Sequence, residues 1–504
     1  MSDETILYSY SPATGEAIGS VPVTEIQAIP GMLNRARVAQ RRWGDLALEE
    51  RLRILPRLRG ALMAQKEEIA RLVSWETGKP FAESLAVELI PGLDMIRFLR
   101  KEAGRIWKPE RLGLGWFVHK RSILEHLPLG VVGIISPWNY PFGIPFTQVV
   151  VALMAGNAVL LKPSELTPLS AVRLVEIFHQ VGLEPGLLQL ISGDGSQGAA
   201  LVSAGIDKVV FTGSVATGKK VMSSAAQGLI PLTLELGGKD PMLVLRDANL
   251  ERAANGAVWG AFTNAGQVCA SVERCYVERP VAEEFIAKVV AKTVQLRQGS
   301  PLERAPGGEV VVKPVDIGPL INETQRQKVQ AQVEDALQRG GRVLCGGRPR
   351  TDLPGYFYPP TVLVDVPPAA EVWQEETFGP LLPIAVVASA EEGIALANQS
   401  RYALSASVWS QNRTLARTVA GRLEVGTVWI NDVIYTYGLA ATPWGGFKES
   451  GLGRTHSAIG LQDFTQVRHR NESYYPLTSE LQWYPYTAKK QVWLERLFKF
   501  LYGR

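Results

Sequence analysis

The segments GVVGIIS (residues 130–136) and NAVLLKPS (residues 157–164) are two short runs rich in Val, Ile and Leu. Each run ends in a turn, as strands buried in a parallel sheet do. The same form returns in LLQLISG (residues 187–193) and KVVFTGS (residues 208–214), and helical stretches separate the four runs. This alternation of strands and helices predicts a doubly wound α/β domain, whose ligands bind at the carboxyl ends of the strands.

The chain on either side of these runs shows two further patterns. Residues 26–105 have apolar positions with a period near 3.6 and are rich in Arg, Glu, Leu and Ala, which predicts helices. A second α/β unit is predicted to begin near Asp240. Its expected strands are PMLVLRDAN (241–249), VERCYVERP (272–280), FGPLLPIAVV (378–387), ALSASVWS (403–410) and GTVWIND (426–432).

The composition is that of a globular protein of two or three domains, with 504 residues of which 46% are hydrophobic. A formal net charge of +4 is small for this length and argues against nucleic acid as a partner. The three cysteines, Cys269, Cys275 and Cys345, form no disulfide framework, so we expect a cytoplasmic protein. We expect no secretory signal, because the N-terminal segment MSDETILYSY is acidic and polar and has no apolar h-region. We expect no transmembrane span, because no apolar run reaches about 18 residues.

Two segments just after predicted strands have the composition of a nucleotide site. In FTGSVATGKK (residues 211–220), Gly213 and Gly218 flank a turn into a helix, where backbone N–H groups can face a phosphate. In LLKPSELTP (residues 160–168), Lys162 and Glu165 can bind ribose hydroxyls, and the carboxylate favours NAD over NADP. The alternatives are a plain strand–helix turn in the first segment and a solvated helix start in the second.

Two other segments contain polar side chains suited to catalysis. Glu235, in LELGGKD (residues 234–240), follows an apolar strand, where partial burial raises a carboxyl pKa and suits it to general base work. Asn139, in SPWNYPF (residues 136–142), is an amide in a rigid turn that can donate a hydrogen bond to an oxyanion. A paired structural carboxylate and an ordinary turn asparagine are the alternatives.

Cys269 lies in the small-residue segment FTNAGQVCAS (residues 262–271) and is either a buried thiol or a nucleophile. A thiol nucleophile, an amide donor, a carboxylate base and a nucleotide cradle together fit the oxidation of a carbonyl compound through a thioester. The four segments are therefore more informative jointly than singly.

Over about residues 5–470 the chain resembles the NAD(P)-dependent aldehyde dehydrogenase superfamily. The resemblance depends on seven motifs in the family's order: PWNYP, KPSE, FTGS, ELGGK, GQVC, EETFGP and PWGGFKESGLGR. It implies the aldehyde dehydrogenase fold and a homodimer or homotetramer. The implied parts are a Rossmann-like cofactor domain (1–120 and 140–239), a catalytic α/β domain (240–440) and a small β oligomerisation arm (121–139 and 455–470).

The resemblance also implies a role for individual residues. Cys269 is similar to the family's nucleophile, Glu235 to its base and Asn139 to its oxyanion donor, which implies hydrolysis of a cysteine thioester to a free acid. Loss of Glu235 would have favoured the alternative, acyl transfer to coenzyme A. A non-catalytic protein on this fold is a second alternative. The positions similar to NAD(P)-binding residues are Ser136, Pro137, Trp138, Lys162, Ser164, Glu165, Gly195, Phe211, Gly213, Ser214, Gly218, Leu236, Glu376 and Phe378.

The segments expected around the substrate are apolar or aromatic. They contain Tyr140, Ile144, Val268, Ala270 and the loop VIYTYGLAATP (residues 433–443). No arginine is evident there, so a neutral, apolar aldehyde, medium- or long-chain or aromatic, is predicted.

One motif departs from the family. After the SGLG segment the family often has GRE, whereas this chain has GRTHS, with Thr455 and His456. We expect the missing carboxylate to change the hydrogen bonding around the base. His119, His126 and His456 are interpreted as structural, and no metal site is predicted, because the spacing of Cys269 and Cys275 fits no zinc pattern.

The last residues, 471–504, form an extension beyond the family's body. From about residue 488 to 502 its pattern is helical, with Val492, Trp493, Leu497, Phe500 and Leu501 on one broad face and with lysines and arginines around it. This pattern is typical of an interfacial membrane helix, so residues 483–504 are a candidate membrane-surface contact. Packing on the chain's own subunit or a neighbour, over the substrate funnel, is the alternative.

Overall fold

The computed structural model describes residues 5–115, 117–475 and 477–503. These residues divide into two compact units. The larger unit comprises residues up to 106 and residues 128–466, and the smaller one comprises residues 107–127 and those from 467 onward.

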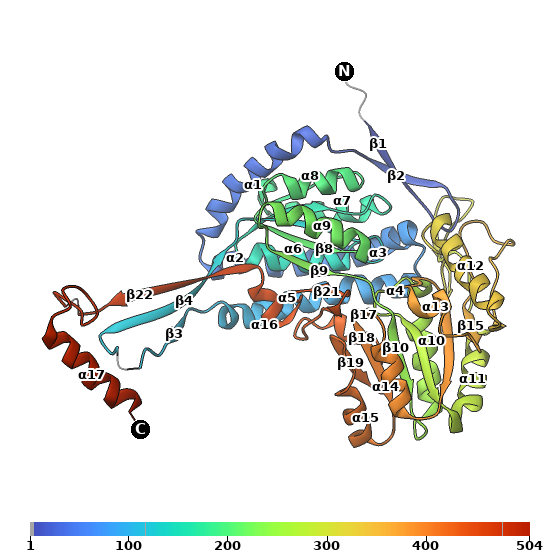
Figure 1. Cartoon of the computed structure of the whole chain (residues 1–504). Helices are drawn as coiled ribbons and strands as arrows, with labels where there is room; N and C mark the ends of the chain where they lie inside the picture. Colours follow the sequence, from blue (N-terminus) through green and yellow to red (C-terminus); the bar gives the residue numbers. More distant parts are fainter. Residues whose placement is uncertain (1–4, 116, 476, 504) are drawn as a thin grey trace. The chain divides into compact units, whose positions relative to one another are not determined.

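A six-stranded sheet in the larger unit contains the runs that the sequence marked as strands (Figure 1). Its order is β21 (Gly451–Leu452), β9 (Leu232–Glu235), β8 (Lys208–Thr212), β5 (Val131–Ile135), β6 (Ala158–Lys162) and β7 (Leu188–Leu190). All its neighbouring pairs are parallel except the antiparallel pair β21–β9. The crossover helices are α6 (Gly143–Met154), α7 (Pro168–Gln180), α8 (Gly195–Ser203) and α9 (Val215–Gln227). The doubly wound prediction is therefore confirmed.

The strand order reverses between β5 and β8, because β5 leads to β6 on one side while β8 leads to β9 on the other. In open α/β sheets this switch point is where ligands bind, just beyond the carboxyl ends of the strands. The segment after β5 contains Asn139, and the segment after β8 contains Gly213 and Ser214. The topology thus brings two of the predicted motifs to one crevice.

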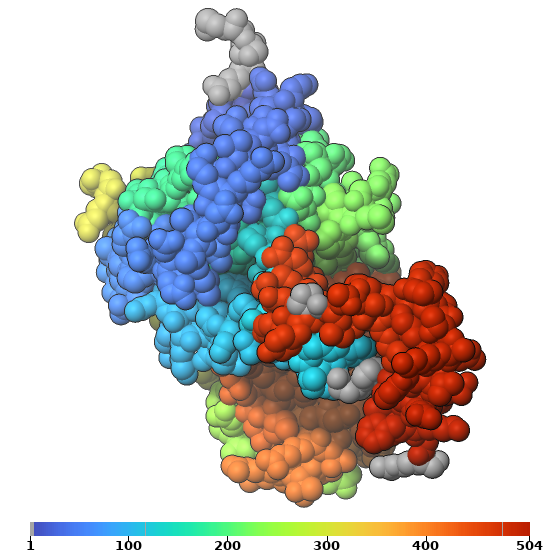
Figure 2. Space-filling view, turned by 90° about the vertical axis from the view of Figure 1, so that its left-hand side faces the viewer, coloured from blue at the N-terminus to red at the C-terminus, as the bar shows by residue number. Residues whose placement is uncertain are grey.

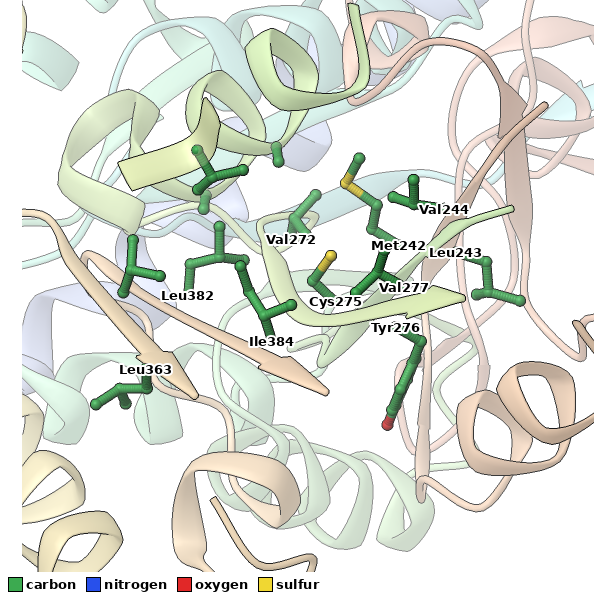
Figure 3. Packing of buried hydrophobic residues seen from close by; sticks show 14 of the residues in the cluster. Met242, Leu243, Val244, Val272, Cys275, Tyr276, Val277, Leu363, Leu382 and Ile384 are labelled. Carbon is green, nitrogen blue, oxygen red and sulfur yellow. The ribbon is translucent and has the colours of Figure 1, made fainter. Parts of the chain in front are cut away.

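A seven-stranded sheet forms the second α/β part of the larger unit. Its order is β14 (Arg342–Cys345), β15 (Thr361–Val364), β16 (Leu381–Val387), β11 (Val272–Glu278), β10 (Asp240–Val244), β18 (Ser405–Trp409) and β19 (Thr427–Ile430). Its helices are α10 (Leu250–Phe262), α11 (Arg279–Thr293), α12 (Glu323–Gln338), α13 (Glu371–Gln374), α14 (Ala390–Asn398) and α15 (Arg413–Ala420). Figure 3 shows Cys275 and Tyr276 pointing to opposite faces of β11, so apolar side chains fill both faces of this buried strand.

The N-terminal helical region matches the predicted period. It contains η1 (Ile26–Ala28), α1 (Ile29–Gly44), α2 (Leu48–Leu52), α3 (Leu55–Thr77), α4 (Phe81–Glu83), the π-helix η2 (Ser84–Leu89) and α5 (Ile90–Ile106). The blue residues in Figure 2 form a continuous band of surface from this region. The remaining short elements of the larger unit are β1 (Ile6–Tyr10), β2 (Ala17–Pro22), η3 (Pro185–Leu187), η4 (Thr263–Gly266), β12 (Leu302–Arg304), β13 (Val310–Val312), β17 (Tyr402–Ala403), η5 (Tyr435–Gly438), β20 (Phe447–Lys448) and α16 (Ser457–Gln462).

A three-stranded sheet and one helix form the smaller unit. The sheet order is β22 (Thr465–Ser473), β4 (Lys120–Pro128) and β3 (Glu110–Leu112). The helix is α17 (Ala488–Tyr502), where the sequence predicted it, and it contains no buried residue. Within the described residues, no helix is long and apolar enough to cross a bilayer.

Two ranges expected to be arm strands, 121–139 and 455–470, need correction. Residues 131–135 form β5 at the centre of the six-stranded sheet, because their side chains are apolar enough to be buried on both faces. Residues 457–462 form the helix α16. Only β4 and β22 within these ranges lie in the three-stranded sheet.

Candidate active site

Three cavities of the larger unit adjoin one another in series through shared lining residues, and two of them include Cys269. A cavity of about 330 Å³ has apolar walls and includes Cys269. A second, of about 200 Å³, includes Cys269 together with Asn139 and Glu235. A third, of about 600 Å³, shares Trp138 and Gly213 with the second and extends past Lys162. The thiol therefore lies where an apolar cavity meets a polar one.

The loop before Cys269 has an unusual backbone. Asn264, Ala265 and Gly266 all have positive φ, at 50°, 54° and 73°. A Cβ at position 266 would lie 2.2 Å from the carbonyl oxygen of Gly379, so only glycine fits there. Such strained conformations persist only where the surroundings fix them, and they gather at functional sites.

Gln267 links this loop to the segment that precedes α12. Its Nε2 donates to the carbonyl oxygen of Asn264 (3.0 Å), and its Oε1 accepts from the backbone N–H of Ile321 (2.8 Å). The carbonyl oxygen of Gln267 in turn accepts a hydrogen bond from Nδ2 of Asn139 (2.9 Å). An amide NH₂ has two donors, so Asn139 retains one N–H for a ligand in the shared cavity.

Glu235 ends strand β9 and is 5% exposed. Its Oε1 accepts from the hydroxyl of Thr455 (3.5 Å), and its Oε2 has no hydrogen-bond partner among the residues that the structure describes. Burial raises the pKa of this carboxyl well above its usual value, and nearby Arg454 offsets part of that effect. Burial also raises the pKa of the Cys269 thiol, with smaller contributions from the carboxylates of Asp240, Glu376 and Glu235.

A network of buried charged residues, which could not be recognised from the sequence, fixes the loop of Asn139 and the loop of Asn264. Nζ of Lys79 lies 2.6 Å from Oε1 of Glu88, with both side chains fully buried, and it also donates to the carbonyl oxygen of Asn139 (2.8 Å). Oε2 of Glu88 accepts from the backbone N–H of Gly143, at the start of α6 (2.6 Å). Glu83 accepts from the backbone N–H of Asn264 (2.9 Å), and burial raises the pKa of Glu83 to about 7.

Removing the cation of this network should destabilise the protein strongly. We expect Lys79→Met to lower the free energy of unfolding by about 3–5 kcal/mol, because Glu88 is then left buried without its partner. Midpoints of chemical unfolding measure the effect. Lys101→Met, at a side chain that is 81% exposed, is the matched control and should change stability by less than about 0.5 kcal/mol. A Lys79→Met protein as stable as this control would contradict the ionic role of the network.

The 600 Å³ cavity contains the expected nucleotide motifs. Ser214 caps α9 by accepting from the backbone N–H of Thr217 (3.3 Å), so the positive end of that helix faces the cavity. Lys162 is 4% exposed and its Nζ lies 3.4 Å from Oε2 of Glu165. Oγ of Ser136 is buried without a partner among the described residues and lies in the same wall. A helix N-terminus, a cation and unsatisfied polar groups fit a dinucleotide such as NAD(P).

Glu376 and Phe378 lie on a loop that lines the second cavity and is fixed by buried polar groups. Oε1 of Glu376 accepts from the backbone N–H of Gly238 (3.0 Å), and burial raises the pKa of Glu376 to about 7. The backbone N–H of Phe378 donates to Glu273 (2.8 Å), which pairs with Lys239 (2.6 Å). Phe378 of this loop and Trp138 both line the second cavity, and their ring centroids are 5.4 Å apart.

All but one of the predicted cofactor residues line the second or third cavity. Those in the cavity walls are Ser136, Pro137, Trp138, Lys162, Ser164, Glu165, Gly195, Phe211, Gly213, Ser214, Leu236, Glu376 and Phe378. Gly218 is the exception. A Cβ at this position would lie 2.6 Å from Cδ2 of Leu236, so Gly218 lets α9 pack closely against that side chain.

The 330 Å³ cavity contains all four predicted substrate residues, Tyr140, Ile144, Val268 and Ala270, and part of the predicted loop, including Tyr437. Sequence reasoning missed Trp259 and Trp444, which come from α10 and from the turn after the loop. None of the described residues in its wall is charged. No group of three potential metal ligands occurs in the described part of the chain.

The chain is similar to many proteins of one family. The model of the aldehyde dehydrogenase family matches residues 1–470. A 4,4'-diapolycopene aldehyde oxidase of Methylomonas sp is 39% identical, over 99% of this chain and 92% of its own. A betaine aldehyde dehydrogenase of Cereibacter sphaeroides is 38% identical over 91% and 92% of the two chains. A putative succinate-semialdehyde dehydrogenase [NADP(+)] of Mycolicibacterium smegmatis is 37% identical over 90% and 86%.

Solved structures agree with these relatives. An E. coli NADP dependent enzyme superposes with a TM-score of 0.88 at 34% identity, over 93% of this chain and 95% of the other. PnpE in complex with nicotinamide adenine dinucleotide superposes with a TM-score of 0.89 at 31% identity, over 94% and 96%. The chain therefore belongs to the aldehyde dehydrogenase family and is an NAD(P)-dependent oxidoreductase that acts on an aldehyde.

Proposed function

We propose that this protein oxidises an apolar aldehyde, medium- or long-chain or aromatic, to the carboxylic acid, with Cys269 as nucleophile. The observation that carries the proposal is the apolar cavity of about 330 Å³ that ends at the thiol. An uncharged wall favours an aldehyde whose remainder is a hydrocarbon over a semialdehyde with a second carboxylate. The 39% identical relative is named a 4,4'-diapolycopene aldehyde oxidase, and this name, which is that of an aldehyde on a hydrocarbon chain, supports the same substrate class.

In the proposed reaction the Cys269 thiolate forms a C–S bond with the aldehyde carbon. The resulting alkoxide accepts hydrogen bonds from the Nδ2 amide of Asn139 and from the backbone N–H of Cys269. Bound NAD(P) supplies the acceptor for the hydride that this carbon loses. Water then adds to the thioester carbon and gives a proton to Glu235, the C–S bond breaks, and its electron pair returns to the sulfur. A carboxylic acid and free Cys269 result.

The adenosine end of the cofactor is assigned to the 600 Å³ cavity, with Lys162 and Glu165 at the ribose and Ser214 at the pyrophosphate. Glu376 and Phe378, which line the second cavity, are assigned to the nicotinamide ribose and ring. NAD is the preferred cofactor in this proposal, because the Glu165 carboxylate repels a 2′-phosphate. Lys220 also lines the cavity and is the group that would favour NADP.

Acyl transfer to coenzyme A is less well supported. That reaction needs no water-activating base, whereas Glu235 lies with Cys269 in the wall of one cavity and has a free carboxyl oxygen among the described residues. The non-catalytic alternative is also less well supported, because it would give the thiol, amide and carboxylate no reason to share this cavity.

The three-stranded sheet is proposed as the oligomerisation arm of a homodimer or homotetramer in the cytoplasm. Strand β22 lies at its edge, and almost all its residues are exposed. An exposed edge strand of nine residues is a template for pairing with another chain. Light scattering coupled to size exclusion measures the mass, and a monomer at micromolar concentration would contradict this part of the proposal.

Residues 483–504 are proposed to contact a membrane surface. In α17, Trp493 is 56%, Phe498 68% and Phe500 85% exposed. Lysines and an arginine stand beside these apolar side chains, as in interfacial helices. The diapolycopene aldehyde oxidase aligns over 99% of this chain, a span that reaches into this extension, whereas the betaine aldehyde dehydrogenase aligns over 91%.

Activity toward a ladder of straight-chain aldehydes, from two to sixteen carbons, tests the substrate class, the cofactor and the membrane contact together. We expect the highest kcat/KM for long chains with NAD, and a further gain for those chains on anionic liposomes. The double variant Trp493→Glu and Phe500→Glu should lose the liposome gain, because each added carboxylate opposes burial of the apolar face. Gln491→Glu on the same helix is the control and should keep most of it.

Each part of this proposal has its own contradicting result. A preference for two- or three-carbon aldehydes would contradict the apolar substrate. Higher kcat/KM with NADP would contradict the role of Glu165. Equal activity of all variants with and without liposomes would favour packing of the tail on its own or a neighbouring subunit.

A further inference from the structure

The GRTHS segment, where the chain departs from its family's usual GRE, lies against Glu235. The backbone of Thr455 is fixed by two hydrogen bonds with Trp444, its N–H to the carbonyl of Trp444 and the reverse, each 2.8 Å long. Its hydroxyl donates to Oε1 of Glu235 (3.5 Å). The same hydroxyl lies 3.2 Å from Nδ1 of His456. A row of three polar groups thus runs from an imidazole through a hydroxyl to the proposed base.

His456 is held in this row by its surroundings. The side chain is 5% exposed, and its backbone has a positive φ of 61°, which is uncommon for any residue but glycine. Its ring packs edge-to-face against Tyr437, with centroids 4.8 Å apart. A strained backbone with a buried imidazole persists only where the surroundings over-determine it, and this pattern is found at functional sites.

The charged and titratable groups around His456 and Glu235 determine the protonation states of these two side chains. Burial lowers the pKa of His456 to about 4, and Asp94 opposes this only partly, so the imidazole is neutral near pH 7. A neutral imidazole with its proton on Nδ1 donates to the Thr455 hydroxyl, which then donates to a carboxylate. The other such groups near Glu235 are Arg454, Cys269 and Tyr437, of which only the Arg454 guanidinium favours the ionised carboxylate.

We propose that Thr455 and His456 are positioning residues for Glu235. Their hydrogen-bonded row fixes Oε1 and stabilises the ionised base, while Oε2, which has no partner among the described residues, is left to take a proton from the attacking water. The inference deepens the proposed function and rests on Glu235 being the base for thioester hydrolysis. In that step the water oxygen bonds to the thioester carbon, its proton goes to Oε2, and the sulfur leaves with the C–S electron pair.

The test compares full-length variants by their NADH burst and by steady-state turnover of octanal as a function of pH. Thr455→Val removes the hydroxyl at nearly constant volume. We expect an unchanged burst, turnover about tenfold lower near pH 7, and the acid limb of kcat displaced to higher pH by about one unit, since the lost hydrogen bond had lowered the pKa of Glu235. Thr455→Ser should restore the limb.

Two variants of the histidine provide the second arm. The side-chain amide of Asn lies near the position of Nδ1, whereas that of Gln lies near Nε2. His456→Asn should therefore displace the acid limb less than His456→Gln does, and thermal unfolding checks that both variants fold.

The inference and the proposed function fail in different ways. An acid limb of Thr455→Val that coincides with the wild-type limb, while Glu235→Gln has lost steady-state turnover, would overturn the positioning role and leave the base in place. Equal impairment of Thr455→Ser and Thr455→Val would also overturn it, since it would mean a packing role. Steady-state turnover retained in Glu235→Gln would instead overturn the proposed function.

Discussion

Cys269→Ala abolishes aldehyde oxidation in the proposed mechanism, with a loss of at least about 10⁴-fold in kcat/KM. Among the described residues, the walls of the apolar cavity and the second cavity share Cys269 and Ile144, and of these two side chains only the thiol is a nucleophile. Cofactor binding should persist, since the third cavity does not contain Cys269. Stopped-flow NADH absorbance with an apolar aldehyde measures the loss, and quenching of tryptophan fluorescence by NAD measures the binding.

Cys345→Ala is the matched control for this prediction. Cys345 is a partly exposed thiol at the end of β14 and lies outside all three cavities. Cys275 is unsuitable as a control, because it is fully buried in the core of the seven-stranded sheet and its truncation leaves a cavity. If Cys269→Ala keeps more than about 1% of wild-type turnover, a covalent thioester at this position is contradicted.

Glu235→Gln should separate the two halves of the reaction. We expect a burst of one NADH per active site followed by steady-state turnover reduced by about 10²–10³-fold, because only the hydrolytic half uses the base. Glutamine has nearly the same shape and still accepts the hydrogen bond from Thr455 through its carbonyl oxygen. Rapid mixing of enzyme, NAD and aldehyde resolves the burst from the later phase.

Hydroxylamine provides a chemical control for Glu235→Gln. It attacks a thioester without needing a general base, so millimolar hydroxylamine should restore turnover of this variant by forming the hydroxamate. Loss of the burst as well would mean that Glu235 also deprotonates the thiol. Unchanged steady-state turnover would show that the raised pKa of this buried carboxyl has no part in hydrolysis.

Much of the fold could be predicted because strands and turns are specified locally. The runs at 130–136, 157–164, 187–193 and 208–214 correspond to β5, β6, β7 and β8. In β5, β6 and β8, apolar residues without polar alternation are buried on both faces, whereas β7 lies at the sheet edge and is half-buried. Helix α17 matches the predicted residues, because its pattern of apolar and basic positions has the helical period.

The contacts that position the site could not be predicted from the sequence. Lys79 lies in the loop before α4, and Glu83 and Glu88 follow among apolar residues, so only the tertiary fold shows that Lys79 contacts Asn139 and that Glu83 contacts Asn264. Nothing in the local sequence predicts the π-helix η2, which begins directly after Glu83 and contains Glu88.

Two further features depend on distant contacts in the same way. In the sequence, Gly218 belongs to a turn of the kind that binds phosphate. Its close contact with Leu236 could not be predicted, because Leu236 follows β9, which comes later in the chain. The sequence alone predicts a structural role for His456, whereas its position beside the base depends on the pairing of Thr455 with Trp444.

Intact-protein and peptide mass spectrometry of Glu235→Gln is the most direct test of the central claim, a thioester on Cys269. The variant is mixed with NAD and decanal for one turnover, acid-quenched and digested. The account predicts the mass of a decanoyl group on the peptide that contains Cys269, present only when NAD and aldehyde are both added. An unmodified Cys269 peptide, or an acyl group on Cys275 or Cys345 instead, would contradict it.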